Sequence, residues 1–172
     1  MKKFFLLLLI PIILFSSSCI RNNNGYKFPD RKIIRIALVL PGSINDSTWN
    51  SGSYNGLKRF ENDYKAEIAV VEKVSREEAE KIFPKIAEKE FDLIIGHSYE
   101  YTRFLKKLAP LHPKTFFCVT GGETSTIPNL CSVNFKNEQY GYLIGVVAGL
   151  NTSTNKIGIV VGEKIPTVEK II

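Results

Sequence analysis

Short apolar runs rich in β-branched residues alternate with amphipathic segments from residue 32 onward, and this alternation constrains the fold most. Residues 32–40 read KIIRIALVL, a run apolar enough to be covered on both faces, as the strands of a parallel sheet are. Similar runs follow at 66–74, 91–98 and 114–122, with a helical pattern between each pair. The order predicts an α/β fold built on a doubly wound parallel sheet.

The connecting segments carry the periodicity and the start signals of helices. Residues 48–64 place apolar side chains on one stripe of a helix. Ser75 and Glu78 have the spacing of a capping box, which predicts that the second helix begins there. Pro84 lies inside this second helix, and we expect it to kink or divide the helix.

The regular alternation of strand and helix patterns changes after the fourth predicted strand. A polar link at 123–129 leads to a short strand at 130–135, a helix at 136–150 with glycines every four residues, and another buried strand at 156–163. Residues 165–172 have the pattern of the first turns of a further helix. Because such a strand and helix lack packing partners, we expect the sequence to be a fragment or a truncated product.

The first residues have the organisation of an export signal. Two lysines precede an apolar run that ends in three serines before Cys19, so residues 1–18 are predicted to be a signal peptide. The apolar run is shorter than the roughly 20 residues that a membrane-spanning helix needs. Cys19 resembles the acylated cysteine of bacterial lipoproteins, and residues 19–31 would then be a flexible linker between lipid and domain. An ordinary secretory signal with an incidental cysteine is the alternative.

Composition and spacing argue against two classes of site. Without the two lysines of the signal, 21 of the 23 basic residues remain against 17 acidic ones, a net charge of +4 with both signs interleaved. Nucleic acid binding is therefore not expected. His97 and His112 lack metal-ligand spacing to any cysteine, so no metal site is predicted.

Cys118 and Cys131 lie in segments with the sequence pattern of strands, and we expect two buried free thiols. An oxidising compartment would permit a disulfide between them.

Polar and aromatic residues follow the first and third predicted strands, at the edge where parallel sheets bind ligands. The candidate ligand-binding residues are Asn45, Asp46, Trp49, Asn50, Ser98 and Tyr99. The indole offers a flat apolar face for a planar ring, and the adjacent amide has both a donor and an acceptor. A purely structural interpretation is equally open, with Asp46 as a helix cap and Trp49 as a spacer between helix and sheet.

Motifs of cofactor binding and catalysis are missing from the sequence. No G-x-G-x-x-G follows the first strand, and no G-x-x-x-x-G-K-[ST] occurs. Ser98 follows His97 directly, but neighbouring residues of a strand point to opposite faces and no G-x-S-x-G surrounds the serine. We therefore expect neither a cofactor nor an enzyme.

Three stretches of the chain resemble the basic membrane protein family of lipoproteins. They read IALVLPGSINDSTWNSGSYNGL, FDLIIGHSYEY and SVNFKNEQYGYLIGVVAGLNTSTNKIGIVVG. The resemblance implies a substrate-binding component of an ABC importer, in a family whose best understood members bind purine nucleosides. It also implies a periplasmic-binding-protein-like fold of type I, with residues 32–131 as the first lobe and residues 132–172 as the beginning of the second.

The resemblance also implies roles for the candidate residues. Asn45-Asp46 and Trp49-Asn50 match positions that give the ligand an aromatic stack and a polar contact, and Ser98-Tyr99 matches a pair that follows the third strand. The expected protein is a lipid-anchored receptor in the envelope of a bacterium, with a nucleoside as ligand and ABC permease subunits as partners. A surface adhesin or antigen that binds host macromolecules, and an inactive truncated product, are the alternatives.

Overall fold

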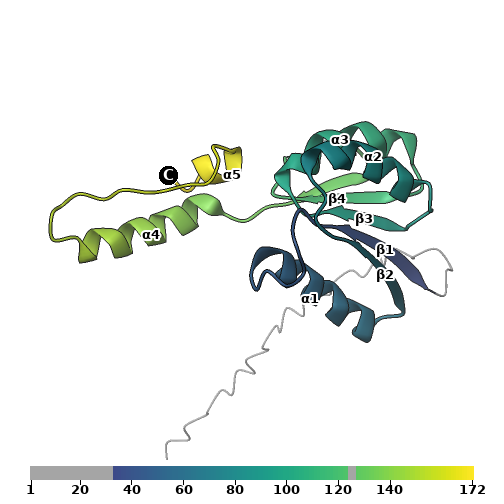
Figure 1. The fold of residues 1–172 in the computed structure, drawn as a ribbon, viewed down its shortest axis with the longest axis horizontal. Coiled ribbons are helices and arrows are strands. Elements are labelled where there is room, and N and C mark those ends of the chain that lie inside the picture. The colour runs from purple at the N-terminus through teal and green to yellow at the C-terminus, as the bar shows by residue number, and fades with distance from the viewer. Residues whose placement is uncertain (1–32, 124–126) are drawn as a thin grey trace, which may run out of the picture. The chain divides into compact units, whose positions relative to one another are not determined.

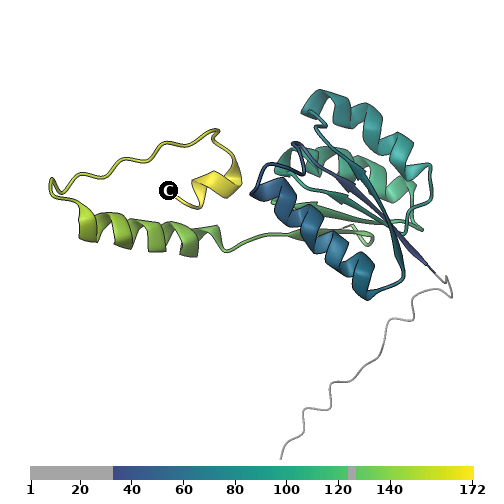
Figure 2. The ribbon, with the colours of Figure 1, turned by 60° about the horizontal axis from the view of Figure 1, so that its bottom comes forward.

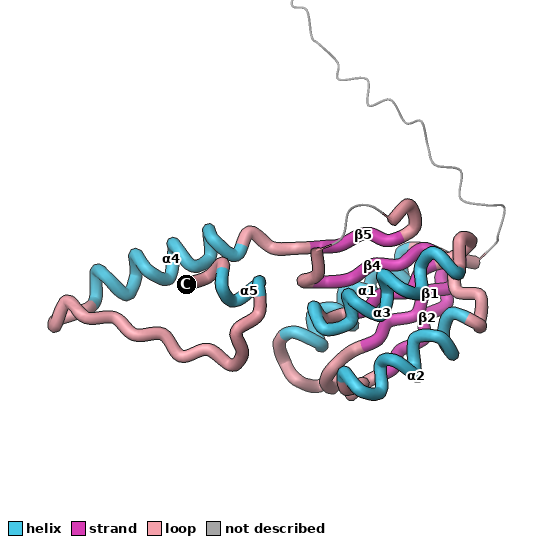
Figure 3. The backbone as a smooth tube through the Cα atoms, turned by 90° about the horizontal axis from the view of Figure 1, so that it is seen from above, coloured by secondary structure: helices cyan, strands magenta, loops and turns pink. Residues whose placement is uncertain are grey.

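A five-stranded parallel sheet is the centre of the computed structural model, which describes residues 33–123 and 127–172. The predicted signal peptide, linker and Cys19 lie outside the described residues. The strands are β1 (Ile34–Val39), β2 (Ala66–Val71), β3 (Leu93–Gly96), β4 (Phe116–Thr120) and β5 (Leu130–Val133). They are ordered β2-β1-β3-β4-β5, and every neighbouring pair is parallel. Figure 3 shows β5 beside β4. The predicted α/β class and parallel sheet are confirmed.

Helices cover both faces of this sheet, as in a doubly wound fold. The helix α1 (Trp49–Asp63) packs on one face, and α2 (Arg76–Ala87) and α3 (Thr102–Leu108) pack on the other (Figures 1 and 2). Two 3₁₀ turns, η1 (Tyr99–Tyr101) and η2 (Ala109–Leu111), flank α3. Because the strands are parallel, their carboxyl ends all lie at one end of the sheet. β1 and β3 are neighbours, so their carboxyl ends lie next to each other.

Each face of the sheet has its own apolar core. Under α1 the core contains Ile36, Leu38, Leu40 and Leu57. Under α2 and α3 it is larger and includes the fully buried rings of Phe83, Tyr101 and Phe117. The Tyr101 hydroxyl donates a 2.6 Å hydrogen bond to the Val74 carbonyl, so this buried polar group has a partner.

The start of α2 confirms the predicted capping box. The Ser75 hydroxyl accepts from the Glu78 backbone N–H at 3.2 Å, and the Glu78 carboxylate accepts from the Ser75 N–H at 3.0 Å. Pro84 does not divide the helix, which continues to Ala87. Pro84 has no N–H to donate to the Glu80 carbonyl, so the helix lacks this one bond.

Residues 156–163 do not form the predicted buried strand. They have no regular secondary structure, Ile157 and Ile159 are exposed, and Val160 is completely exposed. A strand needs a neighbour for its N–H and C=O groups, and none of the described strands pairs with this segment. The segment has the apolar pattern of a strand, but a neighbouring strand that could pair with it is not among the described elements.

The helix α4 (Asn137–Asn151) forms as predicted, and α5 (Pro166–Glu169) is one short turn. Apolar side chains of α4 are exposed, among them Tyr142, Leu143 and Leu150. Of its regularly spaced glycines, only Gly141 has a close neighbour: a Cβ there would collide with the Ile171 carbonyl. No helix in the described part of the chain is both long enough and apolar enough to cross a membrane.

The two cysteines of the domain are free, but they are not both buried as expected. Cys118 is half-buried in β4, whereas Cys131 is exposed in β5. The difference arises because β5 is the last strand of the sheet and pairs only with β4. The face of the sheet that carries both cysteines also exposes Phe116 and Val133, so the core under α1 does not extend to this edge.

Candidate ligand-binding site

The carboxylate of Asp46 organises the segment that follows β1. Its Oδ1 accepts from the backbone N–H groups of Thr48 and Ser51 at 3.0 and 2.9 Å. Its Oδ2 accepts from the backbone N–H and the side-chain Nδ2 of Asn50 at 2.8 and 2.7 Å. These hydrogen bonds hold the pKa of Asp46 well below its usual range. Asp46 therefore accepts from the N–H groups of Asn50 and Ser51 in the first turn of α1, which is the capping role that the sequence left open.

Asn50 is buried beneath this turn, with only 7% of its surface exposed. Because its Nδ2 donates to Asp46, the orientation of the amide is determined and Oδ1 points elsewhere. This buried oxygen has no hydrogen-bond partner in the described part of the chain. Gly42 makes room for the amide, since a Cβ at that position would lie 2.5 Å from Nδ2.

Trp49 and His97 form a reciprocal pair that joins the ends of β1 and β3. Their rings stack with centroids 4.3 Å apart and an interplanar angle of 23°. The His97 Nε2 lies 3.0 Å from the Trp49 carbonyl oxygen, and the indole N–H donates to the His97 carbonyl at 3.4 Å. Phe135 meets the indole edge-on at 6.0 Å. The indole is 43% exposed, so it is held in place without being enclosed.

The contact with Trp49 decides the tautomer of His97. A carbonyl oxygen only accepts, so Nε2 carries the proton and Nδ1 is an acceptor. This Nδ1 is buried and has no hydrogen-bond partner among the described residues. Burial lowers the pKa of His97, and the bond to the Trp49 carbonyl opposes this only in part. The site thus holds two buried acceptor atoms without donors, His97 Nδ1 and Asn50 Oδ1.

The neutral state of His97 predicts lower stability in acid. Its folded-state pKa lies below the unfolded value of 6.5, so the unfolded chain binds a proton that the folded chain does not. As pH falls from 7.5 through 6.5 toward that lower pKa, the free energy of unfolding should fall by up to about 1.4 kcal/mol per pH unit from this group. Urea unfolding between pH 7.5 and 5 measures the slope. His97→Gln should flatten it and His112→Gln should not; equal slopes in all three proteins would contradict the prediction.

The remaining predicted residues are held by other local bonds. The Ser98 hydroxyl accepts from the Glu100 N–H at 3.3 Å and caps η1. Tyr99 is half-buried, and its carbonyl accepts from the Thr102 hydroxyl. Asn45 is exposed, and its N–H donates to the Ser43 hydroxyl at 3.2 Å. The structure therefore brings together Asp46, Trp49 and Asn50, with Ser98 adjacent to His97 in the chain.

His97 directly follows β3, but it was not chosen among the candidate ligand-binding residues. Its partnership with Trp49 depends on β3 lying beside β1, which strand order decides and local sequence does not. The signal that could have found it is its position at a carboxyl strand end next to two other candidates, Ser98 and Tyr99.

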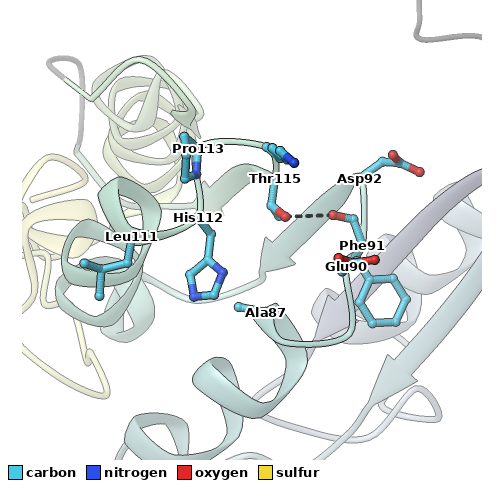
Figure 4. Close-up of a pocket in the computed structure, with 9 residues that line it drawn as sticks. Ala87, Glu90, Phe91, Asp92, Leu111, His112, Pro113 and Thr115 are labelled. Carbon is cyan, nitrogen blue, oxygen red and sulfur yellow. Dashed lines mark hydrogen bonds between the residues drawn. The ribbon is translucent and has the colours of Figure 1, made fainter.

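A cavity of about 250 Å³ lies at the opposite end of the strands, where the chain enters β3 and β4 (Figure 4). It is lined by Ala87, Glu90, Phe91, Asp92, Leu111, His112, Pro113, Lys114 and Thr115. The Thr115 hydroxyl donates to the Phe91 carbonyl at 3.0 Å and ties the two loops together. Because ligands of open parallel sheets bind outside the carboxyl ends, we do not place the ligand site here. No cluster of three metal-ligating side chains occurs within residues 33–123 and 127–172.

Comparison with known proteins assigns the chain to a family. Residues 33–172 match the family model of the PnrA-like ABC transporter substrate-binding proteins. The chain belongs to this family. The predicted resemblance is thereby confirmed, and basic membrane protein A of Borreliella burgdorferi is among its relatives, with 25% identity over 165 residues. The aligned region covers 94% of this chain and 47% of that protein.

The chain is also similar to a curated relative and to a solved structure. The CD4+ T-cell-stimulating antigen of Listeria monocytogenes is 28% identical over 139 residues, which cover 77% of this chain and 39% of the antigen. The solved ABC transporter solute-binding protein of Aeropyrum pernix K1 superposes with a TM-score of 0.72 at 21% identity, over 80% of this chain and 40% of that one. This likeness confirms the periplasmic-binding-protein type of fold. The chain spans less than half the length of these relatives.

Proteins of this family are substrate-binding components associated with ABC transporters, and they are generally not enzymes. They are extracytoplasmic and membrane-associated.

Proposed function

We propose that this chain forms the first lobe, residues 32–131, and the beginning of the second lobe, residues 132–172, of a lipid-anchored nucleoside receptor. The receptor would deliver its ligand to ABC permease subunits, with Cys19 as the lipidated residue. The observation that carries the proposal is the exposed indole of Trp49, which His97 holds at the carboxyl edge of the sheet.

The indole suits a planar ligand. One of its faces lies against the imidazole of His97, and the two mutual hydrogen bonds restrict its rotation. An aromatic side chain that is already in place loses little conformational entropy when a ring stacks on it. A nucleobase has the flat, apolar faces that such a surface accepts.

The two unpaired acceptors support a ligand with hydrogen-bond donors. His97 Nδ1 and Asn50 Oδ1 are both acceptors, because Trp49 and Asp46 determine the proton position of one and the amide orientation of the other. A nucleoside carries N–H and O–H groups, which could satisfy both atoms after a small displacement of the covering side chains. A ligand with acceptors alone would leave them unpaired, which is unfavourable for buried groups.

The affinity of this chain by itself should be low. A small ligand is bound tightly when about 70 to 90% of its surface is enclosed. The family relatives are about twice as long, and one lobe supplies only one wall of a cleft. We therefore expect a dissociation constant on the order of 1 mM, which corresponds to only about 4 kcal/mol.

Calorimetric titration of the purified full chain in detergent tests the ligand. Adenosine, guanosine and uridine are compared with free ribose and glucose as controls. The expected result is weak, saturable binding of at least one nucleoside and no binding of either sugar. Failure of every nucleoside to bind at millimolar concentration would overturn the nucleoside assignment.

A surface antigen or adhesin is the second candidate function, favoured by the relative from Listeria that is named an antigen. In this case the domain would be exposed on the cell surface and would hold host macromolecules. Protease treatment of intact cells distinguishes the two functions, together with a pull-down against extracellular matrix. Complete protection of the domain in intact cells would exclude the adhesin.

A further inference from the structure

Cys118 and Cys131 are direct partners across the outermost pair of strands. They occupy the same register position of the parallel pair β4 and β5. Neighbouring strands lie about 4.8 Å apart, and partners in register point to the same face of the sheet. This spacing falls within the roughly 4.4 to 6.8 Å that separates the Cα atoms of disulfide-bonded cysteines. The backbone thus already brings the two thiols within bonding range.

The edge position of β5 allows the small adjustment that a bridge requires. The Cβ atoms of bridged cysteines lie about 3.5 to 4.5 Å apart, slightly closer than cross-strand neighbours usually do. β5 has four residues and, among the described strands of the sheet, has β4 as its neighbour on one side, so it can move without breaking a second strand ladder. A central strand would not have this freedom.

The two thiols differ in their access to solvent. Cys131 is exposed, and Cys118 is half-buried. Burial raises the pKa of the Cys118 thiol, and the neighbouring Cys131 adds to the effect. An oxidant from solution therefore reaches Cys131 first, and Cys118 is the thiol that reacts second.

We propose that Cys118 and Cys131 are a redox-active pair that forms a reversible disulfide by exchange with a low-molecular-weight disulfide. The Cys131 thiolate attacks the small disulfide, forms a mixed disulfide and releases one thiol. The Cys118 thiolate then attacks the Cys131 sulfur, closes the protein disulfide and releases the second thiol. The protein loses two electrons and two protons, and the oxidant becomes two thiols.

The disulfide would hold β5 against β4 at the edge of the sheet. It would add a covalent bond to the hydrogen bonds there, in which the Gly121 N–H donates to the Val133 carbonyl at 2.8 Å and Asn134 donates to the Gly122 carbonyl. These bonds lie just after the bridge along the chain and just before Phe135, which contacts Trp49. The inference does not depend on the ligand assignment, although an extracytoplasmic family is consistent with an oxidising environment.

Peptide mapping tests the bridge directly. The full chain with Cys19→Ser has only Cys118 and Cys131, and both lie in the tryptic peptide 115–136. The reduced protein is incubated with oxidised glutathione at pH 8.5, blocked, and digested with trypsin and then with a protease that cleaves after Glu123. In the expected result the fragments 115–123 and 124–136 remain joined until a reductant is added. Because Cys118 must first lose a proton, closure should accelerate about tenfold per pH unit between pH 7 and 8.5.

Matched variants identify the role of each thiol. With Cys118→Ser added, Cys131 should retain glutathione as a stable mixed disulfide; with Cys131→Ser, modification of Cys118 should be slow. Oxidation should raise the thermal midpoint of the two-cysteine chain by several degrees and leave both variants unchanged. Separated fragments, or a mixed disulfide at Cys131 that persists at pH 8.5 while Cys118 is present, would overturn the proposal.

Discussion

Replacement of Phe83 by alanine should lower the free energy of unfolding by about 3 to 5 kcal/mol. The ring is fully buried in the core under α2 and α3, and it meets the Tyr101 ring edge-on with centroids 5.1 Å apart. It also lies against Gly96 in β3, a residue that has no side chain of its own to fill the space. Truncation therefore leaves a cavity beneath β3, the strand that His97 directly follows.

Urea unfolding monitored by circular dichroism measures the loss. Phe83→Leu keeps most of the volume and should cost about 1 kcal/mol, whereas Leu111→Ala at an exposed position should change stability by less than about 0.5 kcal/mol. An unfolding free energy of Phe83→Ala that matches that of Leu111→Ala would show that α2 does not pack on the sheet as described.

Replacement of Trp49 by alanine should weaken nucleoside binding by about tenfold or more, equivalent to at least about 1.4 kcal/mol. Stacking of a base on an aromatic side chain typically contributes about 1 to 3 kcal/mol, and the indole is the exposed aromatic group at the carboxyl end of β1. Calorimetry with the nucleoside that binds best to the unaltered chain measures the change.

Trp49→Phe is the matched control, because it keeps an aromatic face and should retain most of the affinity. Since the indole also stacks on His97, the stability of both variants must be measured in parallel. Unchanged affinity in a folded Trp49→Ala protein would place the nucleoside elsewhere, without removing the evidence that a nucleoside binds.

Several elements were predictable because their causes are local. The predicted strand at 32–40 corresponds to β1, whose Ile36 and Leu38 side chains share an apolar core with Leu57 of α1. Ser75 and Glu78 began α2 because the two groups that bond are three residues apart. Such features depend on hydrogen bonds and periodicity within a few residues, which one sequence displays fully.

Two predictions were wrong because they required knowledge of neighbours. Residues 156–163 have the pattern of a buried strand, yet the described chain offers them no ladder. The residues around Cys131 in the sequence predict a buried thiol, yet Cys131 is exposed because β5 lies at the edge of the sheet. Burial is a property of what packs on a residue, and that partner can be far away in the sequence.

The sequence by itself determined the α/β class, the family and the position of the candidate site after the first and third strands. Only the tertiary structure decided that the ring of His97 stacks on Trp49 and that Cys118 faces Cys131. The physical reason is that strand order and register determine which distant side chains meet, and they follow from the packing of the whole domain.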